Sequence, residues 1–311
     1  MGRKLTWSAY NRFMTFRASY LRAPERGRVI STGRRILKYS FKPIILIDYM
    51  LSNSEAIYKF PMRNIEKAQI LGYVKHGRLD QFDIEILEFF TAMGFQTFLC
   101  STDVRDSKYA NEWVRKENFG RDSSFLRDFA RNLQFIEFER LEIVILNDSM
   151  VWDSVGLRSL IEKLRASEHN KIFFPTESVY PKSHVQPYLI YASLDKDYVQ
   201  MFSKSFEWVR TLHFKRSLIE YVEYTMLSKL EDQGWLVGVV VRHKDLFATE
   251  TEAFNGRKLN PTQHLWRCLP VHGIVGIKRS LINTNPVNVH DAPGNLDEAL
   301  TSLRKIFYEP K

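Results

Sequence analysis

The stretch LEIVILNDSMVWDS, residues 141–154, decides the fold class of this chain. Residues 143–146 are apolar and rich in β-branched side chains, which favours a buried strand. Three small polar residues, Asn147, Asp148 and Ser149, follow at once. A buried strand that ends in a carboxylate places that carboxylate at the edge of a sheet, which is where α/β proteins bind their ligands.

The segments around this strand alternate between strand and helix patterns. Strands are expected at 68–74, 95–100, 141–146, 171–174, 186–192 and 236–241, and helices at 80–93, 123–132, 157–166, 197–209 and 215–231. This alternation predicts an α/β fold with a central, mostly parallel sheet that is covered by helices on both faces. Gly94 is expected to end the first of these helices as a C-terminal capping glycine.

The composition indicates a globular protein of a reducing compartment. A hydrophobic content of 44% over 311 residues is too high for a disordered chain. The two cysteines, Cys100 and Cys268, lie in apolar surroundings, so neither a disulfide framework nor a cysteine metal site is expected. No apolar secretory segment follows the basic N-terminus, and the apolar run at 43–47 is too short to span a membrane. The expected location is the cytoplasm.

The excess positive charge is concentrated at the N-terminus. Residues 1–43 hold eleven Lys or Arg and one acid, interleaved with aromatic residues, whereas the other 268 residues hold 34 basic and 35 acidic side chains. This pattern is typical of a contact with the anionic inner face of the cytoplasmic membrane, of a solvated arm, or of nucleic-acid binding. No nucleic-acid partner is expected, because the body of the chain is close to neutral. The predicted organisation is a basic extension, residues 1–60, before a globular domain, residues 61–311.

Two clusters of polar residues are candidates for donor and metal binding. In ENFGRD, residues 117–122, Asn118 and Gly120 suit a tight turn and Asp122 can cap the next helix. The functional interpretation is a loop that approaches a ligand closely, with Asp122 bonded to a sugar hydroxyl. At the end of the strand, Asp148 can hold Mg²⁺ or Mn²⁺ against phosphates, or it can simply form a turn or cap.

Two further clusters are candidates for sugar binding and catalysis. In SHVQPYLIYA the alternate residues His184, Gln186 and Tyr188 share one side of an extended segment, as a sugar site or as a half-exposed edge. Glu220 and Glu223 lie one helical turn apart and share a face, which is catalytic or merely solvated. The expected core stripe of this helix is Tyr221, Tyr224, Leu227 and Leu230.

Five elements, in this order and spacing, resemble the rhamnan synthesis protein F family of bacterial polysaccharide glycosyltransferases. They are HGRLDQF (76–82), KENFGRD (116–122), IVILNDSMVW (143–152), SHVQPYLIY (183–191), and NPTQHLW (260–266) followed by IKRSLI (277–282). The match extends from about residue 70 to residue 282. It departs from the family at Arg121, where an aromatic residue is usual, at Ser124, where Gly is frequent, and at Pro187, where Ser is frequent.

The resemblance implies a GT-A-type sandwich that binds a nucleotide sugar. Asp148 would hold the divalent cation, Mg²⁺ or Mn²⁺, against the donor diphosphate, assisted by Asn147 or Ser149. The residues implied in donor binding are Asn118, Gly120, Asp122, Asp103 and Asn147. The residues implied in acceptor or sugar binding are His184, Gln186, Tyr188, His264 and Trp266.

The resemblance also implies a general base, because inverting GT-A enzymes use a carboxylate for this role. Glu223 lies eleven residues before Gly234, the spacing found in such enzymes, and Glu220 is the second candidate. The expected activity is metal-assisted, inverting transfer of a sugar, rhamnose by the family name, from a nucleotide-sugar donor. The acceptor is expected to be a bacterial surface polysaccharide or a lipid-linked glycan. The alternative is a non-catalytic carbohydrate-binding or scaffold subunit of a polysaccharide assembly system.

Overall fold

The computed structural model describes residues 45–46, 48–50, 52, 58–60, 65–116, 121–179, 182–213, 215–249, 260–285, 289 and 292–309. The chain divides into two units, Met1–Leu51 and Ser52–Lys311. In the first unit the described residues, 45–46 and 48–50, are helical. The basic segment 1–43 lies outside the described residues, and so does the loop 117–120.

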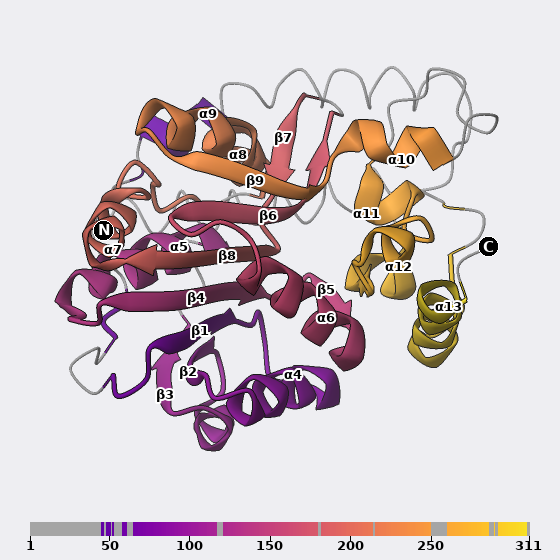
Figure 1. Cartoon of the computed structure of the whole chain (residues 1–311), viewed down its shortest axis with the longest axis horizontal. Coiled ribbons are helices and arrows are strands. Elements are labelled where there is room, and N and C mark those ends of the chain that lie inside the picture. Colours follow the sequence, from indigo (N-terminus) through magenta and orange to yellow (C-terminus); the bar gives the residue numbers. More distant parts are fainter. Residues whose placement is uncertain are drawn as a thin grey trace, which may run out of the picture. The chain divides into compact units, whose positions relative to one another are not determined.

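The second unit contains a mixed sheet, in which eight strands are formed by described residues (Figure 1). They are β1 (Gln69–Val74), β2 (Gln96–Ser101), β3 (Glu112–Arg115), β4 (Arg140–Asn147), β6 (Lys171–Ser178), β7 (His184–Gln186), β8 (Leu189–Asp195) and β9 (Leu236–Val241). Their order is β3-β2-β1-β4-β8-β6-β7, and β9 also pairs with β6. The pairs β3–β2, β2–β1, β1–β4 and β6–β9 are parallel, whereas the pairs β4–β8, β8–β6 and β6–β7 are antiparallel. The α/β class with a mostly parallel sheet is therefore confirmed.

The segment SHVQPYLIYA differs from the single strand that its sequence predicts. It forms two strands, β7 and β8, separated by a turn at Pro187 and Tyr188. Proline cannot donate to a strand ladder, which explains why the extended run is interrupted there. The link from β6 to β7 is too short for a crossover, and β7 and β8 both pair antiparallel with β6.

Helices cover both faces of the sheet. The main helices are α4 (Gln81–Ala92), α5 (Arg121–Asn132), α6 (Ser154–Arg165), α7 (Lys196–Lys204), α8 (Lys215–Leu218), α9 (Tyr224–Asp232) and α10 (His243–Thr249). The C-terminal part adds α11 (Pro261–His264), α12 (Arg279–Asn283) and α13 (Leu296–Tyr308). Short 3₁₀ turns lie elsewhere along the chain, at Val104–Tyr109, Leu133–Phe135 and Leu269–His272. Gly94 follows α4 with φ +91°, so the predicted capping glycine is confirmed.

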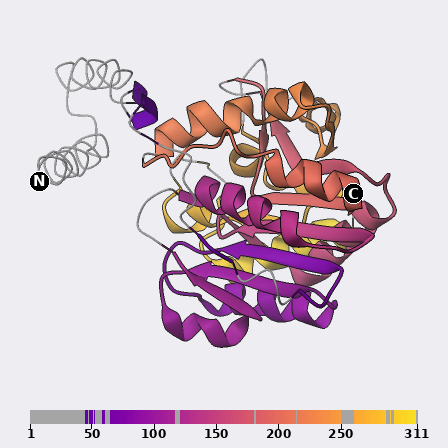
Figure 2. The ribbon, with the colours of Figure 1, turned by 90° about the vertical axis from the view of Figure 1, so that its left-hand side faces the viewer.

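The alternation of side chains along β1 explains how the two faces are filled. Leu71 and Tyr73 belong to a buried cluster with residues of α4 and α6. Gly72 faces the other side, where a Cβ atom would come within 3.0 Å of the Phe129 ring of α5. Small size at this position therefore allows α5 to pack directly against the centre of the sheet. In Figures 1 and 2, α4 lies near β1 and β2, whereas α8 and α9 lie at the β9 end of the sheet.

A second, two-stranded sheet lies next to the end of β4. It consists of β5 (Met150–Trp152) and β10 (Gly276–Lys278), which run antiparallel. Because β1 and β4 are parallel and Val74 pairs with Asn147, these two strands end at the same edge of the main sheet. The turn that leads from β4 to β5 is formed by Asp148 and Ser149, so it lies at the edge where a ligand is expected.

Candidate active site

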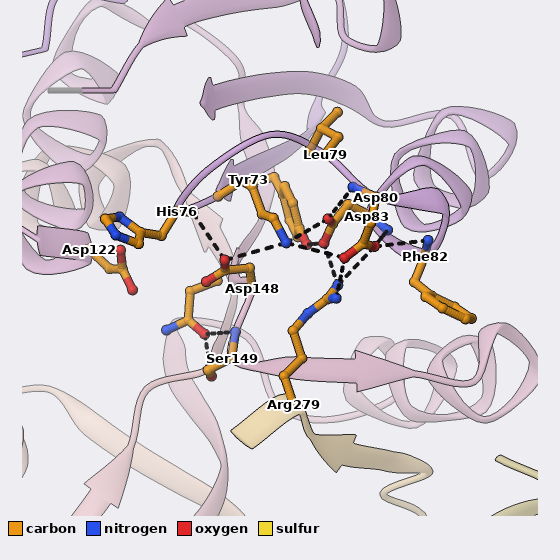
Figure 3. Close-up of polar contacts among 12 residues, drawn as sticks. Tyr73, His76, Leu79, Asp80, Phe82, Asp83, Asp122, Asp148, Ser149 and Arg279 are labelled. Carbon is orange, nitrogen blue, oxygen red and sulfur yellow. Dashed lines mark hydrogen bonds and ion pairs between the residues drawn. The ribbon is translucent and has the colours of Figure 1, made fainter. Parts of the chain in front are cut away.

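Asp148 is fixed at the carboxyl edge of the sheet by the chain that leaves β1. Its amide donates a hydrogen bond to the carbonyl of Val74 (3.1 Å), and its carboxylate accepts one from the amide of His76 (3.0 Å; Figure 3). Asn147 stabilises the same turn, since its Oδ1 accepts hydrogen bonds from the amide (3.1 Å) and hydroxyl (2.5 Å) of Ser149. The strand end thus holds an oriented carboxylate.

The charged groups around Asp148 shift its pKa in opposite directions. Burial, followed by the negative charge of Asp122, raises the pKa of Asp148, whereas Lys75 and the His76 amide act to lower it. The Lys75 Nζ atom lies 3.6 Å from the Asp148 carboxylate. Asp148 is therefore a partly desolvated carboxylate with a second carboxylate nearby, a combination that a bound cation would relieve.

Asp122 lies in the first turn of α5, because this helix begins at Arg121 rather than after Asp122 as its sequence predicts. Its carboxylate lies 3.5 Å from the Nζ atom of Lys116, whose side chain is buried. The charge of Asp122 raises the pKa values of both Asp148 and Glu223. Asp122 is therefore the electrostatic link between the strand edge and the helix that carries Glu223.

Glu223 lies in a π-helical turn, Ile219–Glu223, between α8 and α9. Together with Asp122 and Asn147 it lines a pocket of about 80 Å³. Burial raises the pKa of Glu223, and the positive charges of Lys278 and Lys215 oppose that increase. Three carboxylates from separate elements are therefore coupled at this edge, and two of them line one recess.

The π turn changes which side chains of this helix are buried. The fully buried residues are Val222, Met226 and Leu230, in place of the stripe of Tyr221, Tyr224, Leu227 and Leu230 that a regular helix predicts. Turns of this kind insert an extra residue and are frequent at functional sites. Glu220 differs from Glu223, because its carboxylate forms an ion pair with Arg216 (2.6 Å) four residues earlier.

A cluster of charged residues that the sequence analysis did not assign supports the Asp148 turn. Asp83 is fully buried and accepts hydrogen bonds from Tyr73 Oη (2.6 Å) and Arg279 Nη2 (2.6 Å). Its carboxylate also pairs with Lys75 Nζ (2.8 Å), and Asp80 pairs with both cations (Figure 3). Arg279 comes from IKRSLI, Asp80 comes from HGRLDQF and Asp83 is the residue that follows it, so two segments far apart in the sequence meet here.

Asp103 lies just past the end of β2, as its sequence predicts. It caps a 3₁₀ turn, and its carboxylate accepts hydrogen bonds from the Arg105 amide (3.0 Å) and guanidinium. These bonds hold the pKa of Asp103 at about 2. The carboxylate also lies 4.0 Å from Arg78. Asp103 is thus occupied by two cations near the end of β2.

The side chains expected at a sugar site are mostly engaged inside the protein. Gln186 and Tyr188 are buried and both bond to the hydroxyl of Thr176, at 2.7 and 3.1 Å. Gln186 also donates to Asn260 Oδ1 (3.2 Å), which fixes the start of α11.

The aromatic and histidine candidates are also largely enclosed. Trp266 is buried among apolar residues, and His264 accepts a hydrogen bond from the Asn260 amide (3.0 Å) through Nδ1. His184 is buried, and its ring lies 4.9 Å from that of Tyr224.

Two of the predicted donor-binding residues cannot be placed in the site. Asn118 and Gly120 lie outside the described residues. Among the residues that the structure describes, no group of three or more His, Cys, Asp or Glu side chains is arranged to hold a metal ion. The described helices include none with the length and apolar character needed to cross a bilayer.

No protein-family model matches the chain, and no curated protein matches it.

Proposed function

We propose that this protein is a GT-A-type glycosyltransferase that transfers a sugar from a nucleotide-sugar donor to a bacterial surface polysaccharide or a lipid-linked glycan. The observation that carries the proposal is the electrostatic coupling of Asp148, Asp122 and Glu223 at the carboxyl edge of the sheet. Carboxylates with raised pKa values, such as those of Asp148 and Glu223, are a feature of catalytic sites. The α/β sheet, with its strand edge open to this recess, is the architecture that such a donor site requires.

Glu223 is the proposed general base. Its carboxylate would take the proton from an acceptor hydroxyl while the hydroxyl oxygen bonds to the anomeric carbon and the bond to the nucleoside diphosphate breaks. A pKa above the ordinary range makes a carboxylate a stronger base at neutral pH. Glu220 is less suited to this role because Arg216 pairs with it.

The donor groups at the strand end fit a hard cation that is shared with a substrate. Mg²⁺ is usually bound by one or two carboxylates together with substrate phosphates, rather than by a complete protein cage. Asp148 would supply the carboxylate and Asp122 a second negative charge. A bound Mg²⁺ or Mn²⁺ would neutralise negative charge on the diphosphate.

The proposed site assigns supporting roles to nearby residues. Asn147 and Asp122 would hydrogen-bond the donor, and Ser149 would keep Asn147 in place. The network of Asp83, Lys75 and Arg279 would hold the turn that carries Asp148. The expected place of action is the cytoplasmic face of the membrane, which residues 1–43 would contact through their positive charge.

A ligand screen followed by a turnover assay tests this proposal. The purified protein is heated with a panel of nucleotide sugars, with dTDP-rhamnose included, in the presence and absence of Mn²⁺. A true donor at a hundredfold excess over its dissociation constant stabilises the fold by about 2.7 kcal/mol. Release of nucleoside diphosphate is then measured for the wild type and for Glu223→Gln. Turnover by the wild type that Glu223→Gln loses supports the proposal, whereas carbohydrate binding without turnover favours a non-catalytic binding subunit.

A further inference from the structure

Lys116 is a buried lysine at the carboxyl edge of the sheet. It follows β3, and its amide donates a hydrogen bond to the carbonyl of Ser101 at the end of β2 (2.7 Å). Its side chain is only 2% exposed, and within the described part of the chain its Nζ atom forms no hydrogen bond. An ammonium group with three donors is unfavourable in such a place unless an anion compensates its charge.

Asp122 is the anion that compensates the charge of Lys116. Its Oδ1 atom lies 3.5 Å from the Lys116 Nζ atom, and no other acid among the described residues forms an ion pair with this lysine. Lys75, in contrast, pairs with three carboxylates at the same edge of the sheet. Asp122 lies on the opposite side of Asp148 from Arg279 (Figure 3), so Arg279 is not placed to substitute for Lys116. The charge of Lys116 is therefore committed to Asp122.

Asp122 belongs to the wall of the pocket, whereas Lys116 does not. The pocket, of about 80 Å³, is lined by Asp122 together with Asn147 and Glu223. The Asp122 side chain is 36% exposed, and its second oxygen, Oδ2, accepts no hydrogen bond from the residues that the structure describes. A carboxylate oxygen is an acceptor, so Oδ2 is suited to a hydroxyl group of a ligand. Lys116 acts on such a ligand only through Asp122.

We propose that Lys116 is a positioning residue, whose buried ammonium group holds Asp122 in the pocket wall so that Oδ2 accepts a hydrogen bond from a hydroxyl of the donor. This deepens the proposed function, on which the identity of the ligand as a nucleotide sugar rests. The hydroxyl belongs either to the transferred sugar or to the nucleoside. Without Lys116 the half-exposed carboxylate can adopt other rotamers, and ordering it again on binding weakens the affinity for the donor.

A double-mutant cycle on donor affinity tests this role. The nucleotide sugar that gives the largest thermal shift is titrated by calorimetry into the wild type, Lys116→Met, Asp122→Asn and the double variant. Loss of a hydrogen bond to a charged group should weaken binding about tenfold or more in Asp122→Asn, and Lys116→Met should weaken it by about the same factor. The double variant should bind no more weakly than Asp122→Asn alone, because Lys116 acts through Asp122. Multiplied losses in the double variant would overturn the proposal.

Two further measurements separate positioning from a general loss of structure. Lys116→Met should raise KM for the donor and leave kcat near the wild-type value, because the hydroxyl contact is present before and during the reaction. Lys229→Met, which changes an exposed lysine of α9, should change neither constant.

Urea denaturation of the same variants tests the ion pair without any ligand. Asp122→Asn leaves a buried ammonium group without its anion and should lower the urea midpoint. Methionine replaces that ammonium group by an apolar one of similar length, so Lys116→Met should stay near the wild type, and adding it to Asp122→Asn should restore the midpoint. Equal midpoints of Asp122→Asn and the wild type would show that Lys116 and Asp122 do not pair.

A titration with the nucleoside diphosphate, which lacks the sugar, identifies the source of the hydroxyl. If Lys116→Met weakens the binding of this ligand as much as that of the nucleotide sugar, the hydroxyl belongs to the nucleoside, and if only the nucleotide sugar is affected, it belongs to the sugar. If no nucleotide sugar binds to the wild type, the proposed function fails, and the urea series alone decides whether Lys116 holds Asp122. If a nucleotide sugar is bound and turned over with the same affinity by Lys116→Met, the positioning role alone fails.

Discussion

Replacing Asp83 by Asn is expected to destabilise the fold more than any other single change of charge around the Asp148 turn. Asp83 has no exposed surface, and its carboxylate contacts Tyr73, Lys75 and Arg279 at 2.6 to 2.8 Å. Asparagine keeps the size and one acceptor oxygen but removes the negative charge. Lys75, whose side chain is only 8% exposed, then loses its nearest anion.

The expected loss in the free energy of unfolding depends on the ion pairs that remain after the substitution. Removing one partner of a buried ion pair typically costs about 3 to 5 kcal/mol, because the other charge stays buried. Asp80 still lies 3.4 Å from Lys75 and still pairs with Arg279, so the lower value applies here. A loss of about 3 kcal/mol corresponds to a decrease in Tm of about 6 to 12 °C for a domain of this size.

Urea denaturation followed by circular dichroism measures the change in the free energy of unfolding. Asp80→Asn is the matched control, since Asp80 is 43% exposed and Asn caps a helix as well as Asp does. The control should lose about 1 kcal/mol or less. A free energy of unfolding for Asp83→Asn within 1 kcal/mol of the wild type, or a larger loss in the control, would refute the account of this network.

Three further predictions concern catalysis and membrane contact. Glu223→Gln should lower kcat by a factor of about 10² to 10⁴ with little effect on donor affinity. The control Glu220→Gln, which loses only its Arg216 pair, should stay near wild-type kcat. Loss of donor binding in Glu223→Gln would instead place Glu223 in the donor site. The positive charge of Lys278 acts to lower the pKa of Glu223, and Glu223 must be deprotonated to act as the base. Lys278→Met should therefore move the acid limb of the pH–rate profile to higher pH. An unchanged acid limb would contradict this coupling. Deleting residues 1–43 should abolish sedimentation with anionic liposomes, because each basic residue near the surface contributes about 1 kcal/mol to membrane binding. Activity on a soluble acceptor should persist. Equal sedimentation of the full-length and truncated proteins would exclude this segment as the membrane contact.

Local patterns in the sequence predict the elements that local physics determines. The apolar run before Asn147 is a buried strand, and the α4 helix ends where Gly94 allows a left-handed backbone. The position of Asp148 at a sheet edge also follows from the strand that precedes it. These features depend on side-chain alternation and on one glycine, and both can be read from a short window of sequence.

Features that depend on tertiary pairing could not be predicted in this way. Arg279 lies 196 residues from Asp83 in the sequence, and each is explained locally by a helix start. The π turn before Tyr224 adds one residue to a helix whose apolar spacing still looks regular. Pro187 indicates a break in the SHVQPYLIYA run, because proline disrupts a strand interior. The hydrophobic pattern of the same run favours one continuous strand, which is the prediction that proved wrong.

The most direct test of the proposed activity is a calorimetric titration of nucleoside diphosphate into the wild type and Asp148→Ala, with and without Mn²⁺. The nucleotide is the one that gives the largest thermal shift in the ligand screen, and a urea melt establishes that the variant is folded. We expect Mn²⁺ to strengthen binding to the wild type and to have no effect on Asp148→Ala. Mn²⁺-dependent binding of equal strength in the variant, or no binding of any nucleotide by the wild type, would contradict a metal-assisted glycosyltransferase site at the end of β4.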